Sequence, residues 1–293
     1  MTAMAAALEP PRLQAHELVS QVVRLTTLPM VYMKVKKCVE DVDSSLVDLA
    51  EIIAQDPALS AQLLRIANSA FFGFTAKIST VSRAANLLGT QQVHDLALAA
   101  SVARTFAGIA PEVMDMQRFW HDSIDCGITA RILAVRCNVL DSERLFVEGL
   151  LRDIGHVVLY DRLPGPSAEA LSRARAYGRP LFQVERECLG FDYAQIGSML
   201  MREWRLPQAL QESVHFHPEP AKAQSYPLES SIVHVAARFT EAVSAGLDCG
   251  QWAASVDPFA WRTTGLSETV FAMLMEEATE RTAETVALFF PDR

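Results

Sequence analysis

Apolar residues recur along most of the chain with the 3.6-residue period of an α-helix. The clearest stretch begins after Ser45, where the apolar residues share one face at the spacing i, i+3, i+4 and i+7: Leu46, Leu49, Ala50 and Ile53. Ser45 and Asp48 add a capping-box pattern at the start of this helix. We find no run of strict alternation flanked by hairpin residues, so the pattern predicts an all-α protein.

A capping carboxylate followed by a proline predicts the start of the next helix. Asp56 stands directly before Pro57, which suits the first helical turn because that turn needs no backbone N–H there. We expect this helix to end near the aromatic residues Phe71, Phe72 and Phe74. Aromatic side chains at such a helix end are more often core anchors than a binding platform, and we interpret them in that way.

Two more helices are predicted before the middle of the chain. One follows Ser79 and closes at Gly89, and the other is capped by Thr90 and continues to about Phe106. The Gly- and Pro-containing residues 108–111 are expected to join this N-terminal half to the C-terminal half.

The second half is predicted to be helical as well. Pro164, Gly165 and Pro166 should break the chain between two of its helices, and residues 228–293 return to helical spacing. The helices expected before residue 228 lie at about 112–137, 142–160, 167–177, 180–189 and 192–204.

The charge balance argues against nucleic acid as a partner. The chain has 26 Lys and Arg against 35 Asp and Glu, which gives a formal net charge of −9. Because phosphate binding depends on a cationic surface, we do not expect binding to nucleic acid. Stretches without a charged residue reach only eleven residues, at 66–76 and 84–94, so no membrane span is expected and the cytoplasm is the expected location.

The five cysteines and the common catalytic motifs give little support to a reactive site. The cysteines are scattered and contain no CxxC pair, so neither disulfides nor a zinc knuckle is expected. Motifs typical of P-loop proteins, dinucleotide-binding folds, serine hydrolases and zincins are absent from the sequence. The remaining chemistry consists of histidines and aspartates on predicted helices in the second half.

Several motifs resemble those of the HDOD domain family. The segment DPALSAQLLRIANSAFFGF is followed by KISTVSRAANLLG, and the resemblance continues through FWHDSIDCGITARILA, EGLLRDIGHVVLY and GFDYAQIGSMLMREWRLP. It implies an HDOD domain at residues 21–220, in which an N-terminal helical bundle (21–109) packs on an HD-like bundle (112–220). Residues 221–293 would form a C-terminal helical extension. HDOD domains are related to the metal-dependent HD phosphohydrolases and are regarded as bacterial regulatory or signalling modules.

The resemblance also implies that the HD metal site is degenerate in this chain. Arg152 stands where the HD enzymes have the histidine of their His-Asp doublet, Tyr193 stands where related sequences often have histidine, and Ala237 stands where the HD enzymes have their final aspartate. We therefore expect no metal, no cofactor and no catalytic residue. The positions of the vestigial site would be His121, Asp122, Arg152, Asp153, Tyr193, His215, His217 and Ala237.

Arg152 is the most informative of these replacements. A guanidinium carries a permanent positive charge, has only donors and cannot ligate a cation. We hypothesise that Arg152 pairs with Asp153 or Asp122 and that this internal network stands in for the metal. The simpler interpretation of His121 is a hydrogen-bonded helix histidine, and that of His215 and His217 is a helix-end turn.

The function predicted from the sequence is a non-catalytic signalling module that contacts a protein partner in trans. One alternative is a nucleotide sensor that uses the vestigial cavity, with Arg152 and Arg131 contacting phosphate. A second alternative is an HD-type phosphohydrolase with a rearranged ligand set, for which His121, Asp122, Asp153, His215 and His217 would be the candidates.

Overall fold

The computed structural model describes residues 14–25, 28–68, 77–106 and 113–289. These residues form helices and connecting segments without a β-strand, which confirms the predicted all-α class. Within the described ranges, no helix combines the length and the apolar composition needed to cross a membrane. The predicted helix end at Phe71, Phe72 and Phe74 and the predicted joint at 108–111 lie outside the described residues.

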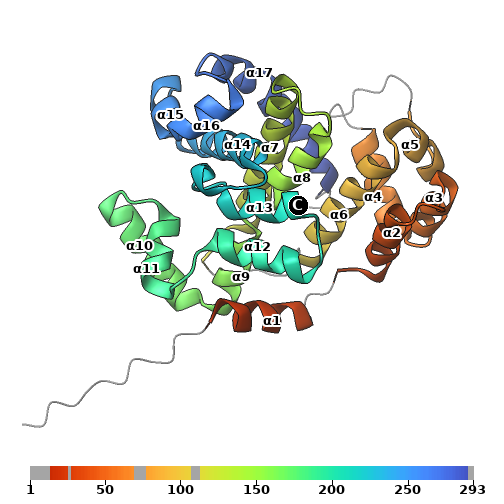
Figure 1. Ribbon diagram of the computed structural model, residues 1–293, viewed down its shortest axis with the longest axis horizontal. Helices are drawn as coiled ribbons and strands as arrows, with labels where there is room; N and C mark the ends of the chain where they lie inside the picture. The colour runs from red at the N-terminus through yellow and green to blue at the C-terminus, as the bar shows by residue number, and fades with distance from the viewer. Residues whose placement is uncertain (1–13, 26–27, 69–76, 107–112, 290–293) are drawn as a thin grey trace, which may run out of the picture.

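The helices fall into an N-terminal group, a central group and a C-terminal group along the chain (Figure 1). The first group consists of α1 (Ala15–Leu25), α2 (Met30–Glu40), α3 (Leu46–Ala54), α4 (Pro57–Ala67), α5 (Val81–Leu88) and α6 (Thr90–Phe106). The second consists of α7 (Met116–Arg136), α8 (Ser142–Leu151), α9 (Ile154–Arg162), α10 (Pro164–Tyr177), α11 (Leu181–Leu189), α12 (Tyr193–Glu203), α13 (Gln208–Phe216) and a 3₁₀ turn η1 (Pro220–Lys222). The third consists of α14 (Pro227–Ala245), α15 (Cys249–Ser255), α16 (Pro258–Thr264) and α17 (Val270–Phe289).

The predicted caps at the first helices are present. The Ser45 side chain accepts the Asp48 N–H while the Asp48 carboxylate accepts the Ser45 N–H, which completes the capping box of α3. Asp56 caps α4 by accepting the Leu59 N–H, with Pro57 in the first turn. These local contacts satisfy backbone donors that a helix start would otherwise leave without partners.

Two of the predicted boundaries are wrong. The segment 142–160 is not one helix, because α8 ends at Leu151 and α9 begins at Ile154, and Asp153 between them has φ −100° and ψ 7°. Residues 164–166 do not break the chain between helices, because Pro164 is the first residue of α10. Prolines are tolerated in the first helical turn, so the sequence Pro-Gly-Pro starts this helix instead of interrupting it.

Helix α7 lies at the centre of the second half, and glycines bring α8 against it. A Cβ atom on Gly127 of α7 would lie 2.7 Å from the Phe146 carbonyl oxygen, and one on Gly149 of α8 would lie 2.7 Å from the Cys126 carbonyl oxygen. The two backbones are therefore in direct contact. Helices α14 and α17 also pack on α7, so the predicted C-terminal extension contributes to the same core.

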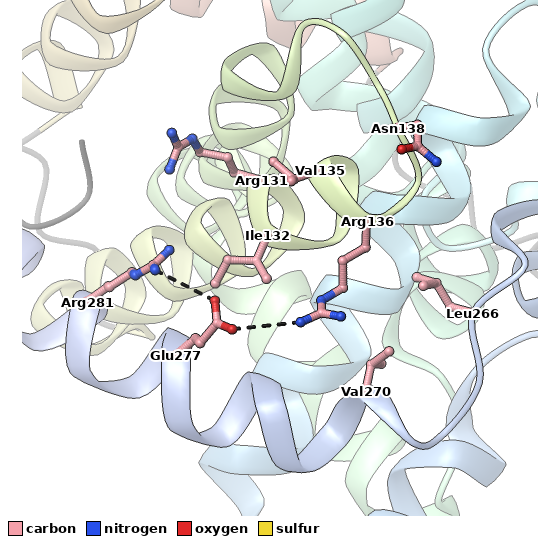
Figure 2. A pocket seen from close by; sticks show the side chains of 9 residues that line it. All are labelled: Arg131, Ile132, Val135, Arg136, Asn138, Leu266, Val270, Glu277 and Arg281. Atoms are coloured by element: carbon pink, nitrogen blue, oxygen red, sulfur yellow. Dashed lines mark ion pairs between the residues drawn. The ribbon is translucent and has the colours of Figure 1, made fainter. Parts of the chain in front are cut away.

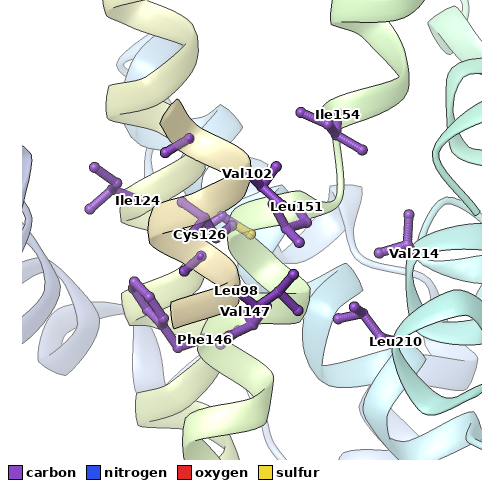
Figure 3. Close-up of a cluster of buried hydrophobic side chains, with 14 of the residues drawn as sticks. Leu98, Val102, Ile124, Cys126, Phe146, Val147, Leu151, Ile154, Leu210 and Val214 are labelled. Carbon is purple, nitrogen blue, oxygen red and sulfur yellow. The ribbon is translucent and has the colours of Figure 1, made fainter. Parts of the chain in front are cut away.

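Helix α6 joins the N-terminal bundle to the HD-like bundle. It packs on α8, and Figure 3 shows Leu98 and Val102 of α6 among the buried side chains of α7, α8 and α13. The predicted packing of one bundle on the other is therefore present. The same core holds the end of α8, where the candidate site begins.

Candidate functional site

The break between α8 and α9 places an ion pair inside the protein. Arg152 is 2% exposed, and its Nη2 lies 2.9 Å from Oδ2 of Asp153. Its Nη1 donates to the backbone carbonyl oxygens of Gly149, at 3.2 Å, and Asp122, at 3.4 Å. Of the two carboxylates that the sequence suggested for Arg152, Asp153 is the partner, and Asp122 contributes its backbone.

The charges of this pair stabilise each other. Burial by itself would raise the pKa of Asp153, but the Arg152 guanidinium, with His156 nearby, holds this pKa below its ordinary value. Burial likewise opposes the charge on Arg152, yet Asp153 keeps the pKa of Arg152 above its ordinary value. Asp153 is therefore ionised and Arg152 is charged at neutral pH.

Tyr193 and His217 form a buried hydrogen bond beside the ion pair. Asp192 caps α12 by accepting the Gln195 N–H, and this places Tyr193 in the first turn. The Tyr193 hydroxyl lies 3.0 Å from Nε2 of His217, whose Nδ1 lies 2.8 Å from the Val214 carbonyl oxygen. A carbonyl oxygen only accepts, so Nδ1 carries the proton and Nε2 accepts from the hydroxyl.

His217 is consequently a neutral side chain. Burial lowers its pKa to about 3, and Asp153 only partly opposes that effect. Nε2 of His217 lies 3.9 Å from Oδ1 of Asp153, which is beyond hydrogen-bonding distance. Both ring nitrogens of His217 are thus occupied by groups of this chain.

His156 and Glu185 complete the network, although neither was predicted from the sequence as a site residue. The His156 ring stacks on Tyr193 with centroids 3.8 Å apart, and its Nε2 lies 3.3 Å from Oε1 of Glu185. The other Glu185 oxygen accepts the Tyr193 N–H at 3.0 Å. Burial would lower the pKa of His156, but Glu185 raises it above its ordinary value. Glu185 belongs to α11 and carries no local sequence signal for this role.

A cleft of about 350 Å³ reaches this network from the surface. Asp153, His156 and Tyr193 lie on its wall, together with Arg238 and Glu241 of α14. Arg238 pairs with Glu241 at 2.7 Å, so the cleft wall is polar and its charges are largely compensated. Arg238 and Glu241 could not be predicted as site residues either, because nothing local to residues 228–245 shows that α14 lines the same cleft as Asp153 and His156.

The other predicted site positions are not part of this network. The His121 side chain is 54% exposed and lies 3.5 Å from the Asp122 carboxylate, which also accepts the Ser244 hydroxyl. His215 stacks on Phe216 near the end of α13, and burial lowers the pKa of His215. Ala237 is buried in α14, one turn before Glu241.

Arg131 does not join Arg152 in a common phosphate site. It lies on α7 beside a different cavity, and its Nη2 is 3.2 Å from the Glu143 carboxylate. The alternative in which Arg152 and Arg131 contact the phosphate of a nucleotide in the vestigial cavity is therefore wrong in its choice of Arg131.

The side chains at the vestigial site do not fit the metal of the HD enzymes. Arg152 brings a positive charge where an imidazole ligand would be needed, and Nε2 of His217 is held by Tyr193. In the part of the chain that the structure describes, no group of three or more His, Cys, Asp or Glu side chains could hold a metal ion. We derive no reaction step through a metal.

Comparison with known proteins places this arrangement in a family. A model of the HDOD domain matches residues 25–220. An uncharacterized protein from Treponema pallidum is 25% identical over 211 residues, which cover 70% of this chain and 40% of that protein. The chain thus spans less than half the length of this curated relative.

Solved structures match nearly the whole chain. A Shewanella amazonensis protein, which its name assigns provisionally to the phosphohydrolases, is 25% identical with a TM-score of 0.75 over 93% of this chain and 97% of that chain. An HDOD domain protein of unknown function from Geobacter sulfurreducens is 18% identical with a TM-score of 0.75 over 94% and 98%. A Marinobacter aquaeolei protein, assigned provisionally to signal transduction, is 20% identical with a TM-score of 0.71 over 92% and 60%. The last two likenesses show the fold alone.

Proposed function

Because this chain belongs to the HDOD domain family, we propose that it is a non-catalytic regulatory module that acts through contacts with another protein. The observation that carries the proposal is the ion pair between the buried Arg152 and the partly buried Asp153 at the end of α8. A charged guanidinium at this position supplies the positive charge that a metal would supply, and it cannot activate a water molecule as a metal does.

The Tyr193–His217 hydrogen bond supports the same proposal. It occupies the ring nitrogen that would otherwise be available to a ligand, and it connects α12 to the end of α13. Because the Tyr193 hydroxyl and both ring nitrogens of His217 have partners within the chain, this bond holds α12 and the end of α13 together as one rigid body. Such a rigid body is suited to presenting a surface to a partner.

The N-terminal bundle offers apolar side chains for such a contact. Val42, between α2 and α3, is 98% exposed, and Met30 and Val47 are also largely exposed. All three lie in or between α2 and α3, where they are accessible to a partner protein. The name of the Shewanella amazonensis protein favours phosphohydrolysis instead, so catalysis is the alternative that an experiment must test.

Metal loading distinguishes the two functions. We would offer Mn²⁺ or Fe²⁺ to the wild-type protein and to the triple variant Arg152→His/Tyr193→His/Ala237→Asp, remove free metal, and measure metal per chain. The wild type should retain only substoichiometric metal and should not hydrolyse bis-p-nitrophenyl phosphate, whereas the triple variant should retain more metal. The surface changes Arg162→His/Tyr177→His are the matched control. Stoichiometric metal in the wild type, with hydrolysis, would overturn the proposal.

The protein contact is tested by crosslinking in the native cell. A photoreactive amino acid at position 42 should give a discrete protein adduct, because Val42 lies in the proposed contact region. The same label at Tyr177, which is exposed on α10, is the control and should not give that adduct. Identical adducts from both positions, or none from position 42, would argue against a contact at the N-terminal bundle.

A further inference from the structure

A second cavity lies between the C-terminal half of α7 and α17, away from the vestigial site. Its volume is about 640 Å³, and none of its lining residues lines the cleft at Asp153. Figure 2 shows α17 along one side of the cavity and the last turns of α7 along the other. This volume lies in the range of small-molecule sites, about 300–1,000 Å³.

Three arginines from the two helices line this cavity: Arg131, Arg136 and Arg281. Glu277 is the acidic residue among the lining side chains, and it lies 3.8 Å from Arg136 and 3.6 Å from Arg281. Glu277 therefore forms an ion pair with each of the two guanidiniums, and its single negative charge is shared between two positive charges. Because Glu143 pairs with Arg131 at 3.2 Å, the excess positive charge of the lining comes from Arg136 and Arg281, on a chain whose net charge is −9.

The arginines are close enough to affect one another. Burial lowers the pKa of Arg131, and the positive charge of Arg281 lowers it further, although Glu143 opposes both effects. Gathering like charges around a cavity opposes folding unless another interaction offsets their repulsion. Glu143 and Glu277 offset part of this repulsion, and an anion bound between the helices would offset the remainder.

The rest of the lining is apolar. Ile132 and Val135 of α7 face the cavity together with Leu266 and Val270 near the start of α17, and Val135 is 58% exposed. Inorganic phosphate would leave this apolar wall in contact with water. A planar, weakly polar group could instead cover it and stack on a guanidinium plane, as arginine does with aromatic rings.

We propose that this cavity binds a nucleoside phosphate. The phosphates lie between Arg136 and Arg281, where guanidinium groups can form paired hydrogen bonds with phosphate oxygens, and the base covers Leu266 and Val270. Glu277 then competes with the ligand for the same two arginines. The inference goes beyond the proposed regulatory function, because it supplies a site through which a small molecule could act on α17 and on α4, which α17 also contacts.

Calorimetric titration of the full chain without Mg²⁺ tests this proposal. ATP and GTP should bind. Adenosine and pyrophosphate should each bind at least about tenfold more weakly, because adenosine has no phosphate for the arginines and pyrophosphate has no base for the apolar wall. Arg136→Gln and Arg281→Gln should each weaken ATP binding by about tenfold or more. Glu277→Gln should tighten it, because the competing carboxylate is removed. Arg238→Gln at the other cleft is the matched control and should leave affinity unchanged.

The Glu277→Gln variant keeps the experiment decisive if an arginine variant folds poorly, because tighter binding cannot result from unfolding. Absence of ATP and GTP binding to the wild type at millimolar concentration would overturn the proposal. So would loss of binding in Arg238→Gln with no loss in Arg136→Gln, or unchanged ATP affinity in Glu277→Gln. None of these outcomes bears on metal retention at Arg152, so failure here leaves the proposed function standing.

Discussion

The hydroxyl of Tyr193 lies 3.0 Å from Nε2 of His217 and donates a hydrogen bond to it. The two residues are 24 positions apart and come from the start of α12 and the C-cap of α13. Because Nδ1 of His217 donates to Val214, the imidazole is fixed as one neutral tautomer. A side chain of this chain thus occupies the nitrogen at which a histidine could ligate a metal.

Removing this hydroxyl should destabilise the protein without affecting its surface. Tyr193→Phe leaves Nε2 of His217 buried without its donor, which should lower the free energy of unfolding by about 1–3 kcal/mol. Urea denaturation measures the loss. Tyr177→Phe is the matched control, because Tyr177 is exposed and its hydroxyl meets water. Equal losses of unfolding free energy in both variants would show that the buried hydrogen bond does not stabilise the fold.

The contribution of the Arg152–Asp153 pair to stability can be compared with that of Arg162–Asp161, in which the charged atoms are equally far apart. Arg162 lies 2.9 Å from Asp161 at the partly exposed end of α9, as Arg152 lies 2.9 Å from Asp153 in the interior. Arg152→Met should cost about 2–4 kcal/mol, below the full cost for a buried pair, because it leaves Asp153, whose side chain is 22% exposed, without its cation. Arg162→Met should cost less than about 1 kcal/mol, as for exposed pairs. Denaturant unfolding measures both losses of stability. A loss of less than about 1 kcal/mol for Arg152→Met would contradict the interpretation that this pair contributes more because it is buried.

The close approach of α9 and α12 depends on Gly155. A Cβ atom there would lie 1.9 Å from the Tyr193 carbonyl oxygen, so Gly155→Ala must push the two helices apart. We expect a loss of stability of about 1–3 kcal/mol or more. Gly165→Ala on α10 is the control: a Cβ there meets no atom within 4 Å, and alanine favours the helix. A thermal unfolding series in which both variants match the wild type would disprove the role of Gly155.

Acid should destabilise the protein through two buried histidines. The pKa of His217 is lowered to about 3 and that of His234 to about 4, in both cases chiefly by burial. As the pH falls through about 6.5, the unfolded chain binds these protons and the folded chain does not. The free energy of unfolding is therefore highest above pH 6.5 and decreases as the pH falls. Between pH 6 and pH 5, each histidine should contribute a slope of about 1.4 kcal/mol per pH unit.

His234→Gln separates this titration from a general loss of stability. Nδ1 of His234 donates to the His217 carbonyl oxygen and Nε2 accepts the Asp257 N–H, a pattern that an amide can reproduce. The free energy of unfolding of this variant, measured from pH 8 to pH 5, should fall less steeply with pH than that of the wild type, by the contribution of one histidine. An unchanged slope would mean that His234 does not titrate on unfolding.

The sequence by itself determined the class, the family and the first caps. Helical periodicity, the Ser45 and Asp56 caps and the motifs around DPALSAQLLRIANS depend on residues within a few positions of one another, so they can be read along the chain. The family match at 25–220 confirms the resemblance. The chemistry of Arg152 was also evident without a structure, because a guanidinium cannot ligate a cation.

Only the tertiary structure decided which of these residues meet. Tyr193 and His217 converge because Gly155 lets α9 approach α12, and Glu185 and Arg238 join them from helices α11 and α14. His121 and His215 do not join them, although their residue types suited the site equally well. Convergence depends on contacts between helices that are distant in sequence and on the backbone separation that glycine permits, and neither leaves a periodic signal along the chain.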